Sequence, residues 1–308
     1  MAEITPTLMK GSPVASMIYK EIRAEIERLK SHGVSVGLGM LMVGDNPSSA
    51  QYFITTANLC KKLGIEGYQY RLPEDASLNL ILDTIKKLNE DVRISGILIF
   101  LPLPKHIDQR AALNSIAPEK DVDGLGAISI GRLAAEESTY QLFATDISLA
   151  VKNTFLPCTP YGVIRLLQYY GVELKGRDVT VVGKSLTVGK SLALMMLAKE
   201  ATVTVCHRET KGLAEKTRTA DIVCVAAGKP GLITGDMVKE GAVIVDIGIS
   251  SLPQSGGGPA TFVGDVDFES VSKKASYITP VPGGVGPVTI AILLKNTVIS
   301  TKRMFGFQ

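Results

Sequence analysis

The stretch from Val179 to Met196 constrains the fold most, because it reads as a buried strand, a glycine turn and a helix in direct succession. Its β-branched run ends at Gly183, and an apolar run follows Gly189. This order is typical of a parallel strand feeding a helix. Glycine lets backbone approach a ligand closely, and a helix start offers free N–H groups and a positive dipole end. The stretch therefore predicts a ligand that carries phosphate.

The glycine turn differs from the phosphate loop of nucleoside triphosphatases. That loop needs four residues between its first glycine and Gly-Lys-Ser, whereas Gly183 and Gly189 are separated by five. Lys184 also stands where that loop needs glycine, and its Cβ disfavours the required dihedral angles. The common dinucleotide pattern G-x-G-x-x-G is absent as well. On these residues alone, a tight strand–helix turn without any ligand stays open.

Bulk properties indicate an ordinary folded protein. A chain of 308 residues can bury two cores, and 45% hydrophobic with 20% charged residues is typical of globular domains. A formal charge of +3 is too small to indicate nucleic acid or a membrane surface as a partner. The four cysteines form no C-x-x-C pair, residues 1–10 have no apolar core of signal-peptide length, and no 18-residue apolar span occurs. Import into an organelle followed by processing stays open. We expect a cytoplasmic protein with buried, reduced thiols and no metal site.

Helical and strand patterns alternate along most of the chain, which predicts an α/β fold with parallel sheets covered by helices. Between residues 118 and 157 the periodicity fades, and 136–139 reads as an exposed loop. We place a domain junction near Pro157, before a Rossmann-like succession of strands and helices. The expected helices are 12–31, 48–63, 78–88, 109–116, 159–170, 189–199 and 287–304, and the expected strands are 36–43, 68–72, 94–101, 179–182, 202–206, 222–226 and 242–247.

The strand at 202–206 ends in Cys206-His207-Arg208, where the second strand of a Rossmann domain meets the adenosine ribose. An acid at this point favours a free 2′-hydroxyl, and a cation favours a 2′-phosphate. Arg208, helped by Lys184, supplies positive charge and no acid. We therefore predict NADP as the cofactor, with NAD as the alternative. An exposed polar loop is the other interpretation of His207 and Arg208.

Five motifs follow one another along the chain, and they read VGDNPSSAQYF, PEKDVDG, PCTP, VVGKSLTVG and TPVPGGVGP. Together they resemble the methylenetetrahydrofolate dehydrogenase/methenyltetrahydrofolate cyclohydrolase family, the FolD type, over about residues 36–303. The resemblance implies an N-terminal α/β domain that binds folate and carries catalysis (1–157 plus 287–308), and a Rossmann-like NAD(P)-binding domain (158–286). It also implies that folate lies in a cleft between the two domains. The C-terminal helix is expected to pack back on the first domain, and the nucleotide domain to form a homodimer.

The resemblance also assigns roles to single residues. Tyr52 would stack on the folate and Asp123 would bind the pterin ring, since a carboxylate accepts two hydrogen bonds from an aminopyrimidinone edge. These are the candidate catalytic residues. The other implied substrate contacts are Leu101, Pro282, Gly283, Gly286 and Thr289. The implied cofactor contacts are Gly183, Lys184, Ser185, Arg208 and Ile249. The segment PGGVGP can also be interpreted as a domain hinge.

Two positions depart from the family pattern. The family has a lysine four residues after the tyrosine, where this chain has Thr56, and the nearest lysines, Lys61 and Lys62, lie elsewhere on the helix. The family also has a glutamine where this chain has Phe100. Both changes fall on groups that the resemblance assigns to the cyclohydrolase step. Threonine cannot act as a base near neutral pH, and phenylalanine has no proton to transfer.

Hydride transfer is less demanding, because it depends mainly on positioning. We therefore expect oxidation of 5,10-methylenetetrahydrofolate with NADP and a cyclohydrolase step that is lost or weakened. A fully bifunctional enzyme, a non-catalytic paralogue that binds folate or nucleotide, and an altered pterin substrate are the alternatives. Tyr52, Asp123 and the nucleotide turn argue against general decay of the site.

Overall fold

The computed structural model describes residues 5–135, 154–252 and 261–307, which fall into two compact units. The three-stranded unit comprises Ser16–Cys158 and Ile290–Gln308, and the six-stranded unit comprises Met1–Ala15 and Thr159–Thr289. The loop expected at 136–139 lies outside the described residues.

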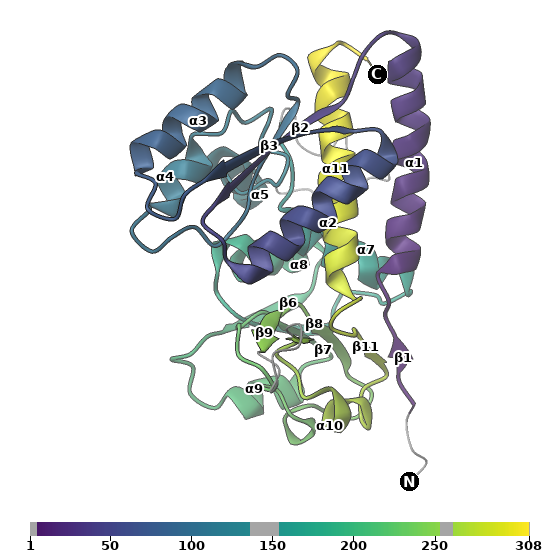
Figure 1. Cartoon of the computed structure of the whole chain (residues 1–308). Coiled ribbons are helices and arrows are strands. Elements are labelled where there is room, and N and C mark those ends of the chain that lie inside the picture. The colour runs from purple at the N-terminus through teal and green to yellow at the C-terminus, as the bar shows by residue number, and fades with distance from the viewer. Residues whose placement is uncertain (1–4, 136–153, 253–260, 308) are drawn as a thin grey trace. The chain divides into compact units, whose positions relative to one another are not determined.

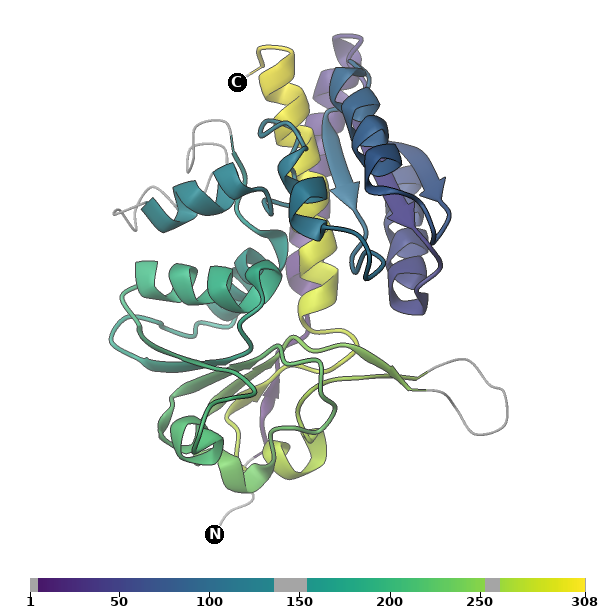
Figure 2. The ribbon, with the colours of Figure 1, turned by 90° about the vertical axis from the view of Figure 1, so that its left-hand side faces the viewer.

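The three-stranded unit is built on a parallel sheet in the order β3-β2-β4. Both β2 and β4 are buried along their whole length, whereas the edge strand β3 alternates between exposed and half-buried residues. The helices α1 and α11 lie side by side (Figure 1 and Figure 2), joined by the ion pairs Lys295–Glu21 and Lys302–Glu25. The strands are β2 (Gly37–Val43), β3 (Glu66–Leu72) and β4 (Gly96–Ile99), and the helices are α1 (Ser12–Ser31), α2 (Pro47–Leu63), α3 (Leu78–Glu90), α4 (Gln109–Asn114), α5 (Ala127–Ala135) and α11 (Val285–Met304).

Local sequence sets both ends of α2, the helix that carries Tyr52. The Asn46 side chain accepts the N–H groups of Ser48 and Ser49, and proline occupies the first helical position. Gly64 ends the helix in the left-handed conformation, with φ of 82°. These two signals fix the register of Tyr52 and Thr56 on the helix.

The six-stranded unit is a parallel sheet in the order β1-β11-β8-β7-β5-β6, with an antiparallel hairpin of β9 and β10 beside it. Its strands are β1 (Thr7–Leu8), β5 (Asp178–Val182), β6 (Thr202–Cys206), β7 (Ile222–Val225), β8 (Val243–Asp246), β9 (Ser250–Leu252), β10 (Thr261–Val263) and β11 (Tyr277–Ile278). Its helices are α7 (Cys158–Tyr169), a π-helical turn (Leu186–Lys190) continued by α8 (Ser191–Ala198), α9 (Leu213–Thr219), a 3₁₀ turn (Gly235–Met237) and α10 (Phe268–Ser272).

The two-domain α/β prediction is confirmed, and most predicted elements occur within a few residues of their expected ends. Helix α5 was not predicted, because it lies within the stretch where the periodicity fades. Its first turn is anchored by side chains from elsewhere: Asn114 and Asp121 accept the N–H groups of Ala127 and Gly126. The two-residue strand β1, too short for a pattern, joins the six-stranded sheet beside β11. Across the described residues, no helix is both long and apolar enough to cross a membrane.

Candidate functional site

Tyr52, Thr56 and Phe100 lie close together in the three-stranded unit. The Thr56 hydroxyl donates to the Tyr52 carbonyl at 2.8 Å, one turn earlier on α2. The Phe100 ring, which follows β4, meets the Tyr52 ring edge-on with 5.3 Å between centroids. The Phe53 ring also packs against the Phe100 ring, with 4.9 Å between centroids. An aromatic cluster of Tyr52, Phe53 and Phe100 therefore supports the side chain expected to stack on folate.

The two departures from the family pattern are both enclosed. Thr56 is 0% exposed and Phe100 is 1% exposed, and the Thr56 hydroxyl is already used within its own helix. Lys61 and Lys62 are exposed in the last turn of α2. Neither of these lysines takes the place of a lysine at position 56.

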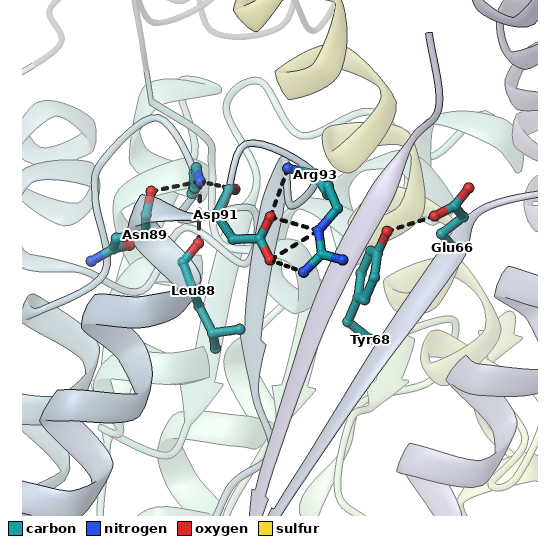
Figure 3. A network of polar contacts seen from close by, with 7 residues as sticks. Glu66, Tyr68, Leu88, Asn89, Asp91 and Arg93 are labelled. Carbon is teal, nitrogen blue, oxygen red and sulfur yellow. Dashed lines mark hydrogen bonds and ion pairs between the residues drawn. The ribbon is translucent and has the colours of Figure 1, made fainter.

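The PEKDVDG segment is held in place by its own side chains. The Lys120 ammonium group donates to the carbonyls of Leu88, Asn89 and Asp91 at 3.2, 2.7 and 2.9 Å. These carbonyls end α3, and Figure 3 shows them converging on one nitrogen. The same figure shows Arg93 paired with Asp91. Burial lowers the pKa of Lys120, whose role is to cap the end of α3.

Asp121 anchors the other side of the same segment. Its carboxylate accepts the N–H groups of Leu125 and Gly126 and the hydroxyl of Ser129, at 3.2, 2.9 and 2.6 Å. Burial raises the pKa of Asp121 to about 6, and these hydrogen bonds oppose the rise. Lys120 and Asp121 thus serve the fold and fix the backbone from which Asp123 projects.

Asp123 is half-buried beside Cys158, and Cys158 and Asn296 hold the backbone next to it. The Asn296 amide donates to the Val122 carbonyl at 2.9 Å, and the Cys158 thiol donates to the same oxygen at 3.3 Å. Burial raises the pKa of Asp123 to about 7, and the charge of Asp121 adds to the rise. Burial and then the charge of Asp123 raise the pKa of Tyr52 well above its usual value. The charge of Asp123 thus acts on the Tyr52 hydroxyl within the three-stranded unit.

Leu101 is tied to the start of α2. The Ser49 hydroxyl donates to the Leu101 carbonyl at 2.9 Å, and Ser49 itself is buried. Sequence reasoning missed Ser49, Cys158 and Asn296 as members of this region. Ser49 and Cys158 belong to the VGDNPSSAQYF and PCTP motifs, so the motifs contained the signal, whereas nothing local marks Asn296.

The glycine turn of the six-stranded unit follows β5. Gly183 has φ of +134°, and a Cβ there would lie 2.2 Å from the Ala226 carbonyl oxygen. A Cβ on Gly189 would lie 2.0 Å from the Gly183 carbonyl oxygen. Backbone packing alone therefore requires both glycines. The fit to a dinucleotide rests instead on the place of the turn at the carboxyl edge of a parallel sheet, together with exposed Lys184 and the Ser185 cap of the following helical turn.

Arg208 lies in a turn after β6, and its guanidinium contacts the Glu209 carboxylate at 2.9 Å. The sequence interpretation assigned no acid to this point, so Glu209 corrects it. Both side chains are largely exposed, and such an ion pair contributes little energy. Glu209 therefore holds Arg208 only weakly. Ile249, the last expected cofactor contact, is 56% exposed after β8.

The TPVPGGVGP segment leads from β11 into α11 within the six-stranded unit. The Gly283 carbonyl accepts the Gly11 N–H at 2.8 Å, and the Thr289 hydroxyl donates to the Val285 carbonyl at 3.3 Å. Pro282 precedes Gly283 in this turn, and a Cβ on Gly286 would meet nothing within 4 Å. The segment therefore offers open backbone at Gly286, as the substrate-binding assignment requires.

Both halves of the chain match described families. Residues 9–123 match "Tetrahydrofolate dehydrogenase/cyclohydrolase, catalytic domain", and residues 157–305 match "Tetrahydrofolate dehydrogenase/cyclohydrolase, NAD(P)-binding domain". A "Bifunctional protein FolD" from Nautilia profundicola is 46% identical over 296 residues, which cover 96% of this chain and 97% of that protein.

Two solved structures have the same fold. The bifunctional FolD enzyme of Campylobacter jejuni is 45% identical, with a TM-score of 0.85 over 96% of this chain and 99% of that one. Trypanosoma brucei FolD, solved in complex with NADP cofactor and an inhibitor, is 35% identical, with a TM-score of 0.88 over 98% of this chain and 99% of that one. The chain therefore belongs to the tetrahydrofolate dehydrogenase/cyclohydrolase family.

Proposed function

We propose that this protein oxidises 5,10-methylenetetrahydrofolate to 5,10-methenyltetrahydrofolate with NADP and does not efficiently hydrolyse the methenyl product. One observation carries the proposal. Thr56 and Phe100 are enclosed and offer no group that exchanges a proton near neutral pH, while Tyr52 and Asp123 are retained. The site has thus kept the groups that hold a pterin and lost those that would activate water.

The retained residues suffice for hydride transfer. An ionised Asp123 accepts two hydrogen bonds from the aminopyrimidinone edge of the pterin, and Tyr52 provides a face for stacking. NADP supplies the hydride acceptor when it is bound, and the six-stranded unit offers Gly183, Lys184, Ser185 and Arg208 to hold it. The hydride leaves with both electrons of its C–H bond, and the lone pairs of the two folate nitrogens delocalise the positive charge that remains, so the protein need only orient its ligands.

Hydrolysis of the methenyl bridge asks for more. Water must be activated next to a cationic carbon, and protons must then move to the folate nitrogens. The Thr56 hydroxyl donates within its own helix, and the Phe100 ring packs against Tyr52 and Phe53. Neither position can contribute a base or an acid. The positive charge of a lysine at position 56 is also missing, and the nearest cation that the structure places at the aromatic cluster is Arg71, 4.6 Å from the centre of the Phe53 ring.

The proposal assigns the folate-binding and catalytic role to residues 1–157 plus 287–308, and the nucleotide-binding role to residues 158–286.

The proposal also includes a homodimer formed through the nucleotide domain. Edge strand β6 exposes Val205, and Leu197 of α8 is 62% exposed. Among the described strands none pairs with the outer side of β6, and such an edge with apolar side chains is a surface that a second copy can cover. Sedimentation equilibrium of wild type and a Leu197→Asp variant tests this, with a monomeric variant as the expected result.

NADPH formation tests the dehydrogenase assignment. Purified protein is mixed with methylenetetrahydrofolate and NADP, and the absorbance of NADPH is followed. The NADPH absorbance should rise with time at a rate proportional to the protein concentration, and an Asp123→Ala variant should abolish this rise. A flat trace at high protein concentration would instead identify a folate- or nucleotide-binding protein without activity.

A fully bifunctional enzyme is the second candidate. The relatives that cover nearly the whole chain at 44–46% identity are named bifunctional. In that case a group other than Thr56 or Phe100 would have to activate water. Asp123, whose pKa is raised to about 7 by burial, is the group near the expected pterin that could exchange a proton.

A further inference from the structure

Two carboxylates are enclosed at one edge of the six-stranded unit. Asp246 ends β8 and is 4% exposed, and Asp265 follows β10 and is 0% exposed. Burial raises the pKa of Asp246 to about 6, and backbone N–H groups oppose the rise. Enclosed carboxylates are costly unless their oxygens accept strong hydrogen bonds. Their partners therefore indicate what these two residues do.

Asp246 and Asp265 pack reciprocally on glycines of each other's segment. Asp246 accepts the N–H groups of Gly248, Asp265 and Val266, each at 3.0 Å. A Cβ on Gly264 would lie 1.9 Å from an Asp246 oxygen, and a Cβ on Gly248 would lie 2.2 Å from the Asp265 carboxyl carbon. Each carboxylate thus packs directly against a glycine. This carboxylate pair, Asp246 and Asp265, holds residues 246–248 next to residues 264–266.

The carboxylate pair also fixes the loop after β7. One oxygen of Asp265 accepts the N–H groups of Ala227 and Gly228, at 2.6 and 2.8 Å. Hydrogen bonds from N–H groups to a carboxylate are stronger than those between neutral groups. The preceding residue, Ala226, places its carbonyl against Gly183 of the nucleotide turn. The loops after β5, β7 and β8 are therefore joined in one backbone arrangement.

The loops after β7 and β8 lie at the carboxyl ends of two strands that belong to the second half of the sheet. A dinucleotide on a doubly wound sheet places its adenosine half over the first two strands and its nicotinamide half over the second half. Here the first two strands are β5 and β6, which precede Gly183 and Arg208. Ile249, exposed directly after the Gly248 segment, gives the second half an apolar surface.

We propose that Asp246 and Asp265 are positioning residues that hold the loops after β7 and β8 in the form that binds the nicotinamide half of the dinucleotide. This inference rests on the proposed use of a dinucleotide by this protein. Neither carboxylate touches the dinucleotide itself. Each acts through the backbone that it holds in place. Loss of either carboxylate therefore weakens binding of the nicotinamide half and leaves binding of the adenosine half unchanged.

Calorimetric titration of the full chain with two ligands tests the inference. NADP probes both halves of the site, and adenosine 2′,5′-bisphosphate probes only the adenosine half. Asp265→Ala should weaken NADP binding by about tenfold or more and leave bisphosphate binding within about twofold of wild type. Asp265→Asn keeps one oxygen that can accept the N–H groups of Ala227 and Gly228, so it should restore most of the NADP affinity.

Asp221→Ala is the matched control. Asp221 lies at the opposite, amino end of β7, where it accepts the Asp178 N–H at 2.9 Å and pairs with Lys239 at 2.6 Å. Its loss should lower stability without changing the affinity for NADP or for the bisphosphate. Gly248→Ala adds a methyl group that displaces the Asp265 carboxylate without removing it. This variant should also weaken NADP binding and leave bisphosphate binding unchanged, and it replaces Asp265→Ala in the test if that variant does not fold.

Unchanged NADP affinity in Asp265→Ala and Gly248→Ala would overturn the inference. Equal weakening of both ligands would overturn it as well, because it would indicate general disruption of the unit. Failure of the wild-type protein to bind NADP is a different result, since it contradicts the proposed function before any variant is compared.

Discussion

The ring of Phe100 meets the ring of Tyr52 edge-on, with 5.3 Å between centroids and 65° between ring planes. An aromatic pair of this geometry contributes about 0.5–1.5 kcal/mol beyond its buried area. Tyr52, the residue expected to stack on folate, is therefore supported from inside the unit by an apolar contact. Phe100 has a structural role of its own, and it cannot be exchanged without affecting Tyr52.

Restoring the family residues should restore hydrolysis only when both are changed. Thr56→Lys alone places a long cation beside an aromatic cluster, where the Phe100 ring offers the ammonium group no polar partner. Phe100→Gln alone supplies no base. The double variant should raise the hydrolysis rate of methenyltetrahydrofolate by about tenfold to a hundredfold, because positioned proton transfer contributes on this scale. Thr55→Lys, which adds the same charge at the neighbouring position, is the control. Additive single effects, or no gain in the double variant, would contradict this coupling.

The pH profile of kcat/KM should report Asp123. Burial raises the pKa of this carboxyl to about 7, and the ionised form is the one that accepts two hydrogen bonds from the pterin. The rate should therefore fall below pH 7, by up to about tenfold per pH unit, and level off above it. Asp123→Asn should remove this inflection along with most of the activity. A wild-type profile that is flat through pH 7 would show that Asp123 does not titrate in the reaction.

Cofactor preference should depend on Arg208 and its neighbour. Arg208→Ala should lower kcat/KM for NADP by about tenfold or more and leave that for NAD nearly unchanged, because only NADP carries the 2′-phosphate. Glu209→Gln removes the competing carboxylate and should raise the preference for NADP. Lys273→Ala, which removes the cation of an exposed ion pair with Glu269 on helix α10, is the control. Equal losses with both cofactors in Arg208→Ala would contradict the assignment.

Lys120 should matter for stability more than for chemistry. Lys120→Met keeps the length of the side chain but leaves the carbonyls of Leu88, Asn89 and Asp91 without their donor. The free energy of unfolding should fall by about 2–4 kcal/mol, since unpaired buried acceptors cost roughly 1–3 kcal/mol each before relaxation. Urea unfolding measures the change, and a loss below about 0.5 kcal/mol would show that water replaces the ammonium group.

Periodicity and turn chemistry predicted most of the fold. The glycine turn and the alternation of strands and helices led to the parallel sheets, because both signals lie within short stretches of sequence. Helix α5 was missed because its first turn depends on Asn114 and Asp121, which lie outside it. The polar stripe of α11 was missed as well. There Asn296 and Ser300 donate to carbonyls 174 to 205 residues away, and no local pattern encodes such contacts.

The candidate site likewise has one part that the sequence predicted and one part that it could not. The motifs identified Tyr52, Asp123 and the nucleotide turn, and the departures at Thr56 and Phe100 could be read directly from spacing. The sequence could not reveal that both departures are enclosed, or that Lys120 and Asp121 serve the fold. Those facts depend on how α2, α3 and α5 pack, and the Asp246–Asp265 pair likewise depends on contacts between loops distant in the chain.

The most direct measurement of the central claim is the ratio of the two folate products to NADPH. Purified protein converts methylenetetrahydrofolate in the presence of NADP, and the methenyl and formyl products are quantified at intervals beside NADPH. Methenyltetrahydrofolate should accumulate one-to-one with NADPH, and formyltetrahydrofolate should appear only at the rate seen without protein. Formyltetrahydrofolate that forms in step with NADPH would contradict the loss of the cyclohydrolase step.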